Sequence, residues 1–331
     1  MSEVMDLVPD AQASDEETRA RVLRVDLQAA IDRDGLSVRT VAEQAAVGYS
    51  TLNAWMKDAY AGRVDSINVK VEAWLNAQRS RDKVRTSSAK TPGFLDIPTA
   101  GTLLSVLEYA QFTPDMGLIT GGAGVGKTEA ALEHQRRNPN VWILTADPDM
   151  KTPNAVLREL CDVIGVENVN SRRMMSSIIR RVTDTQGLVV IDEAQHLKTD
   201  AIDQLRSVHD RARIGVVFMG NEPLRKRIEG MGREASHAMI FSRIGMRKKR
   251  DRPQVKDVAM LLDAWGISEK TIRDLCRFIA MQPGGLRQMN KTISYARMLA
   301  TSAGRAEMSV SDVKAAWREL TNGELPVSAG E

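Results

Sequence analysis

Hydrophobic periodicity divides the chain into helical segments at both ends and an alternating segment in the middle. Between residues 19 and 78, apolar side chains recur every three to four positions, as on the buried faces of packed helices. The first such set is Val22, Leu23, Leu27, Ala30 and Ile31. From about 99 to 252, short apolar runs alternate with helical stretches, which predicts a parallel sheet with helices on both faces. The expected strands are MGLIT, VWILT, GLVVID and IGVVFMG. From 253 to about 321 only helical periodicity continues, in four segments.

The remaining stretches are predicted to be tails and a linker. Residues 1–18 are acidic and polar and are expected to form a disordered tail, with a second tail over 322–331. Residues 79–98 are basic, rich in Ser and Thr and closed by prolines, which is typical of a linker. The chain is therefore expected to hold an all-α domain, an α/β domain and a C-terminal helical domain, over residues 19–78, 99–252 and 253–321.

Composition indicates an ordinary globular protein. Hydrophobic residues make up 43% of the chain and charged residues 27%, which is enough to build a core over most of its length. The two cysteines, Cys161 and Cys276, show neither metal-ligand spacing nor a disulfide framework, which favours a reducing compartment. The N-terminus has no signal pattern, and no apolar run approaches the roughly 20 residues that span a bilayer. We expect a soluble, cytoplasmic protein with no membrane partner.

Charge alone does not decide whether nucleic acid is a partner. The net charge is +3, from 46 basic and 43 acidic residues, and local clustering matters more than this sum. Basic residues cluster at Arg79–Arg85, Arg172–Arg173, Arg180–Arg181, Arg225–Arg227 and Arg243–Arg252. A solvated surface is the ordinary explanation for any one such cluster.

The segment GGAGVGKT, from Gly121 to Thr128, fits the phosphate-binding pattern G-x-x-x-x-G-K-[ST] completely. An expected strand precedes it and an expected helix follows, so a chance glycine-rich turn is a poor alternative. Glycines allow backbone N–H groups to turn toward phosphates, and the helix N-terminus adds partial positive charge. We expect Lys127 to reach the β- and γ-phosphates of ATP and the Thr128 hydroxyl to bind Mg²⁺. The expected nucleotide contacts are Gly121, Gly122, Ala123, Gly124, Val125, Gly126, Lys127, Thr128 and Glu129.

An acidic pair and an amide follow the next expected strands of this domain. In GLVVIDEAQH, Asp192 and Glu193 come at the end of a buried strand, at the sheet edge where such folds bind ligands. Asp192 is expected to hold Mg²⁺ through water, and Glu193 to act as the general base toward the attacking water. A cap on the following helix is the alternative role for this pair. Asn221 ends the strand IGVVFMGN and is expected beside Asp192, where it would orient the water; a simple turn residue is the alternative.

Two arginines are candidates to supply positive charge to the γ-phosphate. Arg287, in PGGLRQMN, opens a helix of the C-terminal segment and would reach the phosphate if that helical lid folds over the nucleotide. Arg243, in FSRIGMRKKR, is expected to act across a subunit boundary as an arginine finger. A surface ion pair is the alternative for each arginine. The expected catalytic set is therefore Glu193, Lys127, Asn221 and Arg243, with ATP and Mg²⁺ as cofactors.

The order of these motifs resembles that of a known family. The segments GGAGVGKT, LVVIDEAQHL, GVVFMGN, FSRI and PGGLR, with VWILT and TQGL between them, closely resemble those of the phage Mu B-like transposition proteins, from about residue 20 to 320. The ATPase motifs are shared by many AAA+ proteins, whereas their combination with NVWILT, FSRI and an N-terminal helix-turn-helix is much more specific. The resemblance implies an α/β fold: an AAA+ P-loop parallel sheet with a C-terminal helical lid and an N-terminal all-α helix-turn-helix domain.

The resemblance also implies a function. Such a protein assembles as a helical filament or ring on double-stranded DNA, recruits and stimulates a transposase, and disassembles when the transposase triggers ATP hydrolysis. Arg172 and Arg173 match a basic stretch of the family suited to DNA, and Lys151 and Thr152 stand where such ATPases often contact the DNA backbone. We expect binding that is largely independent of DNA sequence, because Lys and Arg contacts to phosphates do not read bases.

The N-terminal segment SVRTVAEQAAVGYSTLNAWMKD has the apolar spacing of two short crossed helices, as in a helix-turn-helix. The apolar positions are Val41, Ala42, Ala45, Val47, Leu52, Trp55 and Met56. The second helix would present Tyr49, Ser50, Thr51, Asn53 and Lys57 to solvent or DNA. Ala46 stands where the turn of this motif often has Gly, and a helical bundle without a DNA role is the alternative.

Two other functions share some of these features. A helicase loader or replication-initiator-like AAA+ protein would use the same chemistry, and a neighbouring transposase or helicase gene would distinguish it from a transposition ATPase. A helix-turn-helix regulator in which nucleotide is only a structural ligand is disfavoured by the presence of both Glu193 and Asn221. Loss of hydrolysis with retained ATP binding on Glu193→Gln would fit only the two ATPase hypotheses.

Overall fold

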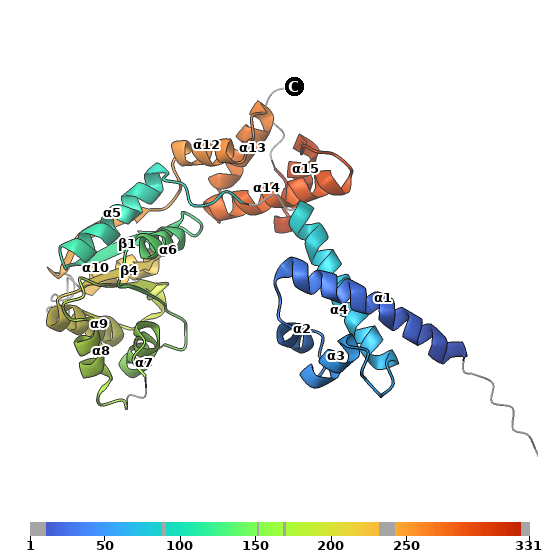
Figure 1. Cartoon of the computed structure of the whole chain (residues 1–331). Helices are drawn as coiled ribbons and strands as arrows, with labels where there is room; N and C mark the ends of the chain where they lie inside the picture. The colour runs from blue at the N-terminus through green and yellow to red at the C-terminus, as the bar shows by residue number, and fades with distance from the viewer. Residues whose placement is uncertain (1–10, 88–90, 151, 168–169, 232–241, 326–331) are drawn as a thin grey trace, which may run out of the picture. The chain divides into compact units, whose positions relative to one another are not determined.

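The computed structural model divides the chain into two compact units, Met1–Ala89 and Lys90–Glu331 (Figure 1). The described residues are 11–87, 91–150, 152–167, 170–231 and 242–325. The first unit is all α, and the second contains both the sheet and the C-terminal helices, which the sequence predicts as two domains. No helix among the described residues is long and apolar enough to cross a membrane.

The first unit is built from four described helices around one apolar core. They are α1 (Ala11–Asp34), α2 (Val38–Gln44), α3 (Tyr49–Met56) and α4 (Asp65–Ser87). The Ser37 hydroxyl caps α2 by accepting from the Thr40 amide at 3.1 Å, and the turn to α3 passes through Ala46 at φ 52°. This left-handed conformation is the reason why glycine is frequent at such a turn. Leu52 and Trp55 are fully buried, as their spacing predicts, whereas Val22 is 60% exposed.

Helices extend further in this unit than the sequence pattern indicates. Residues 11–18, which we expected in a tail, begin α1, because Glu16 accepts hydrogen bonds from Asn68 (2.8 Å) and Arg19 (3.0 Å). The expected linker over 79–98 is also shortened, because α4 continues to Ser87. Polar residues alone do not end a helix. The proline at position 92 does disfavour helical geometry at the residue before it. The expected tails over 1–10 and 326–331 lie outside the described residues.

The second unit is organised around a five-stranded parallel sheet. Its strands are β1 (Met116–Gly121), β2 (Val141–Thr145), β3 (Leu188–Asp192), β4 (Gly215–Gly220) and β5 (Ile244–Arg250), in the order β2-β3-β4-β1-β5. The first four strands are those expected. The sequence analysis missed β5, whose exposed positions are mainly Arg and Lys and therefore give no apolar run. Because β4 lies between β1 and β3, the carboxyl ends of these three strands meet at one edge of the sheet.

Helices cover both faces of this sheet. On one face α5 (Pro98–Phe112) and α6 (Lys127–Arg137) pack against inward residues such as Ile119, Val190 and Val217. On the other face lie α7 (Pro153–Ile164), α8 (Met174–Val182), α9 (Thr199–Ala212) and α10 (Glu222–Met231). The strands β1, β3 and β4 are buried on both faces, which accounts for their unbroken apolar runs.

The C-terminal part of the second unit is a helical lid of four helices, as expected. They are α12 (Val255–Ala264), α13 (Lys270–Ala280), α14 (Gly285–Ser302) and α15 (Val310–Thr321). The buried carboxylate of Asp257, at the start of α12, accepts from the Thr99 amide at 2.9 Å and from the Gln254 amide at 2.6 Å. One charged group thus caps α12 and the first turn of α5 together, which joins the lid to the α/β layer.

Candidate nucleotide site

The phosphate-binding loop joins β1 to α6 and has its lysine in place. Lys127 Nζ donates to the carbonyl oxygens of Gly121 and Gly122, at 2.9 Å in each case. At Gly126, where φ is 99°, an added Cβ would meet nothing within 4 Å, so the concave side of the loop is open. The predicted contacts from Ala123 through Glu129 line one cavity, and Gly121 and Gly122 bind the lysine instead.

The start of α14 packs directly against this loop. The Leu286 amide donates to the Gly124 carbonyl at 3.0 Å, across more than 150 positions of sequence. A Cβ added to Gly124 would lie 1.8 Å from the carbonyl oxygen of Gly284. A Cβ added to Gly285 would in turn lie 2.9 Å from the Gly124 carbonyl oxygen, so glycine at both positions permits a backbone contact that larger residues would block. This contact brings Arg287 to the rim of the cavity, as we expected for a lid folded over the nucleotide.

Replacing Gly124 by Ala is expected to disturb both the loop and the lid. The added methyl group would clash with Gly284, at a residue whose φ of 76° already disfavours a side chain. Such strain costs about 1–3 kcal/mol, so we expect a melting temperature lower by several degrees and weaker binding of an ATP analogue. Gly101→Ala, in α5 with open space around its Cβ, is the matched control and should not lower the melting temperature. Equal melting temperatures for the two variants would contradict the close contact.

The acidic pair lies at the end of β3, opposite the loop. Asp192 is 2% exposed, and its Oδ2 accepts from the Thr128 hydroxyl at 2.6 Å. Glu193 lines the cavity, in a left-handed backbone conformation with φ of 51°. Its carboxylate accepts a hydrogen bond from the side-chain amide of Gln195, a residue to which the sequence analysis gave no role.

Asn221 follows β4 at the same edge of the sheet. Because β4 pairs with β3 on one side and β1 on the other, Asn221 leaves the sheet between the acidic pair and the phosphate loop. Its Oδ1 is buried without a hydrogen-bond partner among the described groups. Buried polar atoms are rarely left unpaired in folded proteins. This oxygen is therefore suited to accept a hydrogen bond from a bound water.

The cavity extends from the loop into an apolar end that the sequence analysis did not predict. Its volume is about 640 Å³, within the range of small-molecule sites. The apolar end is lined by Phe94, Leu95, Ile97, Leu261 and Leu286. Residues 91–97, expected to belong to a linker, are thus one wall of the site. With the phosphates held at the loop, this end has the apolar walls that a purine base requires.

One face of α14 supplies the polar groups of the same cavity. Arg287, Asn290, Lys291 and Ser294 all line it and follow one another at helical spacing. Trp265 Nε1 donates to Asn290 Oδ1 at 2.9 Å, which leaves the amide nitrogen of Asn290 available to a ligand. The spacing of polar residues after Arg287 was the signal in the sequence that could have identified this face.

The charges of the site act on one another. Burial lowers the pKa of Lys127; the nearby carboxylates of Glu193 and Asp192 act in the opposite direction, and Arg287 adds to the lowering. The influence of Arg287 on Lys127 indicates that the two cations face the same region. A triphosphate placed there would compensate both positive charges.

The residues fit a magnesium ion as well as a nucleotide. Mg²⁺ prefers oxygen ligands and in nucleotide sites is bound by one or two protein side chains together with phosphates. The Thr128 hydroxyl and the Asp192 carboxylate form such a pair. The hydrogen bond between them shows that the two oxygens lie close enough to bind the same ion. Both are the residues that the sequence analysis assigned to the metal.

Arg243 is separated from the other predicted catalytic groups. It precedes β5, whose first residue, Ile244, pairs with Met116 at the start of β1, while Arg250 pairs with Gly121 at its end. Seven strand residues at about 3.3 Å each put Arg243 roughly 20 Å from the phosphate loop of its own chain. Its guanidinium forms an ion pair with Asp210 and is 51% exposed. Arg243 therefore does not serve the site of its own chain.

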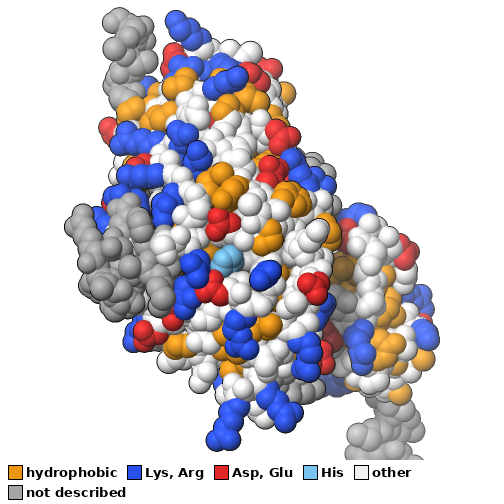
Figure 2. Space-filling view, turned by 90° about the vertical axis from the view of Figure 1, so that its left-hand side faces the viewer, with side chains coloured by type: hydrophobic (Ala, Val, Ile, Leu, Met, Phe, Trp, Pro, Cys, Tyr) orange, Lys and Arg blue, Asp and Glu red, His pale blue; other side chains and the backbone are white. Residues whose placement is uncertain are grey.

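The candidate DNA contacts lie away from the cavity. Arg172 and Arg173 are exposed before α8 and form no ion pair with any described residue. Figure 2 shows Lys and Arg side chains projecting at the lower end of the second unit, at the height of α7 and α8 in Figure 1. Thr152 is exposed but caps α7 by accepting from the Ala155 amide at 3.2 Å, and Lys151 lies outside the described residues.

The exposed side of α3 carries the remaining candidates. Ser50 and Lys57 are exposed, and Thr51 and Asn53 are half-buried. Tyr49, next to them, is 52% exposed, and the guanidinium of Arg39 lies 6.0 Å from its ring. These positions agree with the orientation that the helical spacing predicts for α3.

Comparison with known proteins gives a consistent result over both units. Residues 242–320 match the family described as Mu B transposition protein, C terminal, and residues 110–228 match an AAA domain. The chain is 30% identical over 301 residues to the ATP-dependent target DNA activator B of Escherichia phage Mu, covering 90% of this chain and 95% of that protein. It is also 30% identical to the Mu-like prophage FluMu DNA transposition protein B of Haemophilus influenzae, covering 76% of this chain and 88% of that protein.

Similarity to solved structures concerns the fold alone. The Aeropyrum pernix ORC2 protein, in its ADPNP-ADP complexes, superposes with a TM-score of 0.57 at 16% sequence identity. The match covers 72% of this chain and 71% of that chain.

Proposed function

The chain belongs to the Mu B transposition protein family and contains an AAA-type ATPase domain, and on that basis we propose that it assembles on double-stranded target DNA when ATP is bound and there recruits and stimulates a transposase. Hydrolysis of ATP then releases the assembly from DNA. The relatives that it matches over most of their length are described as target DNA activators or a transposition protein. The chemistry of the described site supports the ATP-dependent part of this proposal.

In the proposed reaction, the described groups bind and orient ATP and the attacking water. Lys127 leaves the carbonyl oxygens of the loop and contacts the β- and γ-phosphates. Thr128 and Asp192 would hold Mg²⁺, and the ion would neutralise charge that develops on the phosphates. Glu193 accepts the proton of the water, and the unpaired Oδ1 of Asn221 orients that water.

The observation that carries the assembly proposal is the separation of Arg243 from its own site. A guanidinium roughly 20 Å from the loop has no role in the same chain, yet it is half exposed at one edge of the sheet. If protomers associate head to tail, the same surface reaches the next protomer's γ-phosphate. ATP then stabilises the contact between protomers, and hydrolysis weakens it.

The test is to image the full-length protein with duplex DNA. We expect filaments or rings on DNA with a nonhydrolysable ATP analogue, and none without nucleotide. Adding its cognate transposase should accelerate phosphate release from the ATP-bound assembly. A protein that stays monomeric and does not bind DNA when saturated with ATP would exclude the proposed function.

DNA affinity should depend steeply on salt because the proposed contacts are to phosphates. Each lost phosphate contact reduces the steepness of the fall of log K with the logarithm of the salt concentration by about 0.9. The double substitution Arg172→Ala with Arg173→Ala should therefore reduce the magnitude of this slope by roughly 1.8. The measurement is DNA binding with the ATP analogue at several salt concentrations and with several DNA sequences. The control is Lys314→Ala with Arg318→Ala on α15, which should leave the slope unchanged. A slope unaffected by the substitutions of Arg172 and Arg173 would remove these two residues from the interface.

A further inference from the structure

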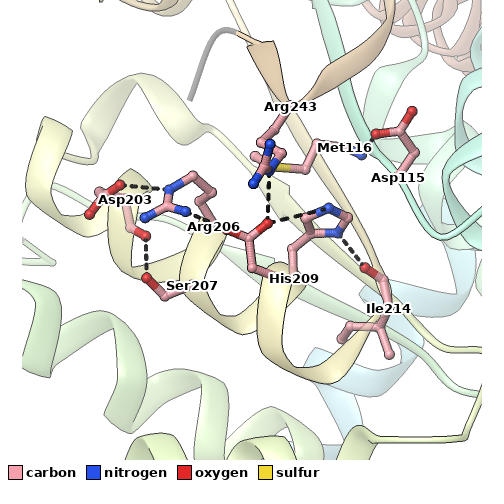
Figure 3. A network of polar contacts seen from close by, with 9 residues as sticks. Asp115, Met116, Asp203, Arg206, Ser207, His209, Ile214 and Arg243 are labelled. Carbon is pink, nitrogen blue, oxygen red and sulfur yellow. Dashed lines mark hydrogen bonds and ion pairs between the residues drawn. The ribbon is translucent and has the colours of Figure 1, made fainter. Parts of the chain in front are cut away.

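Within the described part of the chain, the guanidinium of Arg243 is held through one nitrogen, its Nε. Its Nε donates to Oδ1 of Asp210 at 2.9 Å. In Figure 3, a dashed line leads from the labelled Arg243 to this contact. Among the described residues, no hydrogen bond or ion pair involves its terminal amino groups. Arginine binds phosphate best through two parallel N–H groups, and the terminal pair of Arg243 is available for such a contact.

Asp210 is itself fixed from the other side of its carboxylate. Its Oδ2 accepts from Arg206, one turn earlier on α9, and Arg206 also donates through Nε to Asp203 at 2.8 Å. The Arg206 side chain is only 14% exposed, and the hydrogen bond that it donates to Asp203 raises its pKa, so it stays charged. His209 is the third group that faces Asp210, with Nε2 at 4.0 Å from Oδ1. The carboxylate therefore has little freedom to move.

The backbone of Arg243 is restrained as well. Ile244, the next residue, is 3% exposed in the core beneath α9. At Gly245, an added Cβ would lie 1.9 Å from the carboxylate of Asp115, which also accepts from the Tyr109 hydroxyl at 2.6 Å. The start of β5 is thus packed tightly against α5. Both ends of the Arg243 side chain are fixed, its backbone by β5 and its Nε by Asp210.

We propose that Asp210 is a positioning residue for Arg243, which holds the guanidinium by Nε and directs its two terminal amino groups toward the γ-phosphate bound by a neighbouring protomer. This inference rests on the proposed function, because it assumes that Arg243 acts across the protomer boundary. The shared carboxylate does not cancel the charge of Arg243, since Asp210 also pairs with Arg206. Pre-orientation of this kind lowers the entropy lost when the arginine contacts the phosphate.

The test compares Asp210→Ala and Asp210→Asn with the unsubstituted full-length protein on DNA. A small misplacement of a catalytic group can lower the reaction rate by up to about 100-fold. For Asp210→Ala we expect kcat to fall at least about tenfold. The affinity of each protomer for an ATP analogue should be unchanged. Asp210→Asn should retain more activity, because its amide oxygen still accepts from Nε. In an Arg243→Ala background, Asp210→Ala should have no further effect on kcat. A role of Asp210 that is independent of Arg243, through its contact with Arg206, would instead lower the residual kcat further in that background.

Asp203→Ala is the matched control. It removes the other carboxylate bound to Arg206 from the same helix, but it leaves the contact between Asp210 and Arg243 intact. We expect wild-type kcat for this variant. A loss equal to that of Asp210→Ala would show that the stability of α9 matters and would overturn the inference.

The outcomes separate this inference from the function on which it rests. If Arg243→Ala hydrolyses ATP at the wild-type rate, the arginine has no role between protomers. Both the role of Asp210 and the proposed contact of Arg243 with the neighbouring site are then excluded. If Arg243→Ala is inactive but folded Asp210→Ala is as active as wild type, only the role of Asp210 is excluded. Should Asp210→Ala lose its fold, Asp210→Leu replaces it, because leucine has a similar size but no oxygen that can accept from Arg243 Nε. Wild-type kcat for the folded Asp210→Leu variant would exclude the role of Asp210.

Discussion

Replacement of Glu193 by Gln is expected to lower the rate of ATP hydrolysis by at least about a hundredfold while leaving ATP binding intact. Glutamine has the shape of glutamate but cannot take a proton from the attacking water. Glu193 lines the cavity, and neither Lys127 nor Thr128 depends on it for a hydrogen bond. The binding groups should therefore stay in place. On DNA, this variant should form assemblies with ATP that no longer dissociate.

Multiple-turnover phosphate release with DNA measures the rate, and binding of a fluorescent ATP analogue measures the affinity. Glu108→Gln is a matched control, because it makes the same change at an exposed position on α5. This control variant should have the wild-type rate of ATP hydrolysis and the wild-type affinity for the ATP analogue. Wild-type turnover by Glu193→Gln would assign the base to another group, and loss of binding would mean that Glu193 is a binding residue.

The central part of the fold was predictable because its strands are buried on both faces. Apart from Thr120 in β1 and Asp192 at the end of β3, the strands β1, β3 and β4 consist of apolar residues and glycine, so they were visible in the sequence. The edge strand β5 pairs with β1 alone, and its exposed residues include Arg247, Lys248 and Lys249. Its backbone hydrogen bonds with β1, rather than an apolar pattern, define it as a strand. Such a pairing is not visible in a single sequence.

The candidate site was predictable where its residues are close in sequence. The loop from Gly121 to Thr128 and the pair Asp192–Glu193 have fixed local spacings that follow from their chemistry. The base end of the cavity has no such spacing. It forms because residues 91–97 pass beside α14, and this arrangement depends on contacts between distant segments, such as Thr99 with Asp257 and Gly124 with Leu286.

Composition was the least reliable guide at the ends of the first unit. The polar, basic run after Arg79 was expected to be flexible, yet α4 continues through it to Ser87. Most of its residues have good helix propensity, and a helix needs no apolar stripe once an adjacent turn is already formed. The pair Arg79–Asp26 adds a contact to α1 that only the folded chain provides.

Mixing two inactive variants is expected to restore ATP hydrolysis. Glu193→Gln lacks the base but retains Arg243, and Arg243→Ala lacks the arginine but retains Glu193. In an assembly of equal amounts, about one boundary in four joins an intact Glu193 to an intact Arg243 of the next protomer, as head-to-tail association requires. The mixture should therefore reach about a quarter of the wild-type rate, far above the sum of the separate variants.

Hydrolysis in the mixture should appear only with DNA and only at concentrations at which the protomers assemble. A mixture of Glu193→Gln with Lys127→Ala is the decisive control, because both substitutions lie in the half of the site that one protomer provides. No boundary in that mixture contains a complete site, and we expect no recovery. Recovery of hydrolysis in the control would show that a protomer supplies groups other than Arg243 to the site of its neighbour. If the first mixture stays as inactive as its components, Arg243 does not act between protomers. Its distance from the phosphate loop then has no catalytic meaning, and its contact with Asp210 is a surface ion pair.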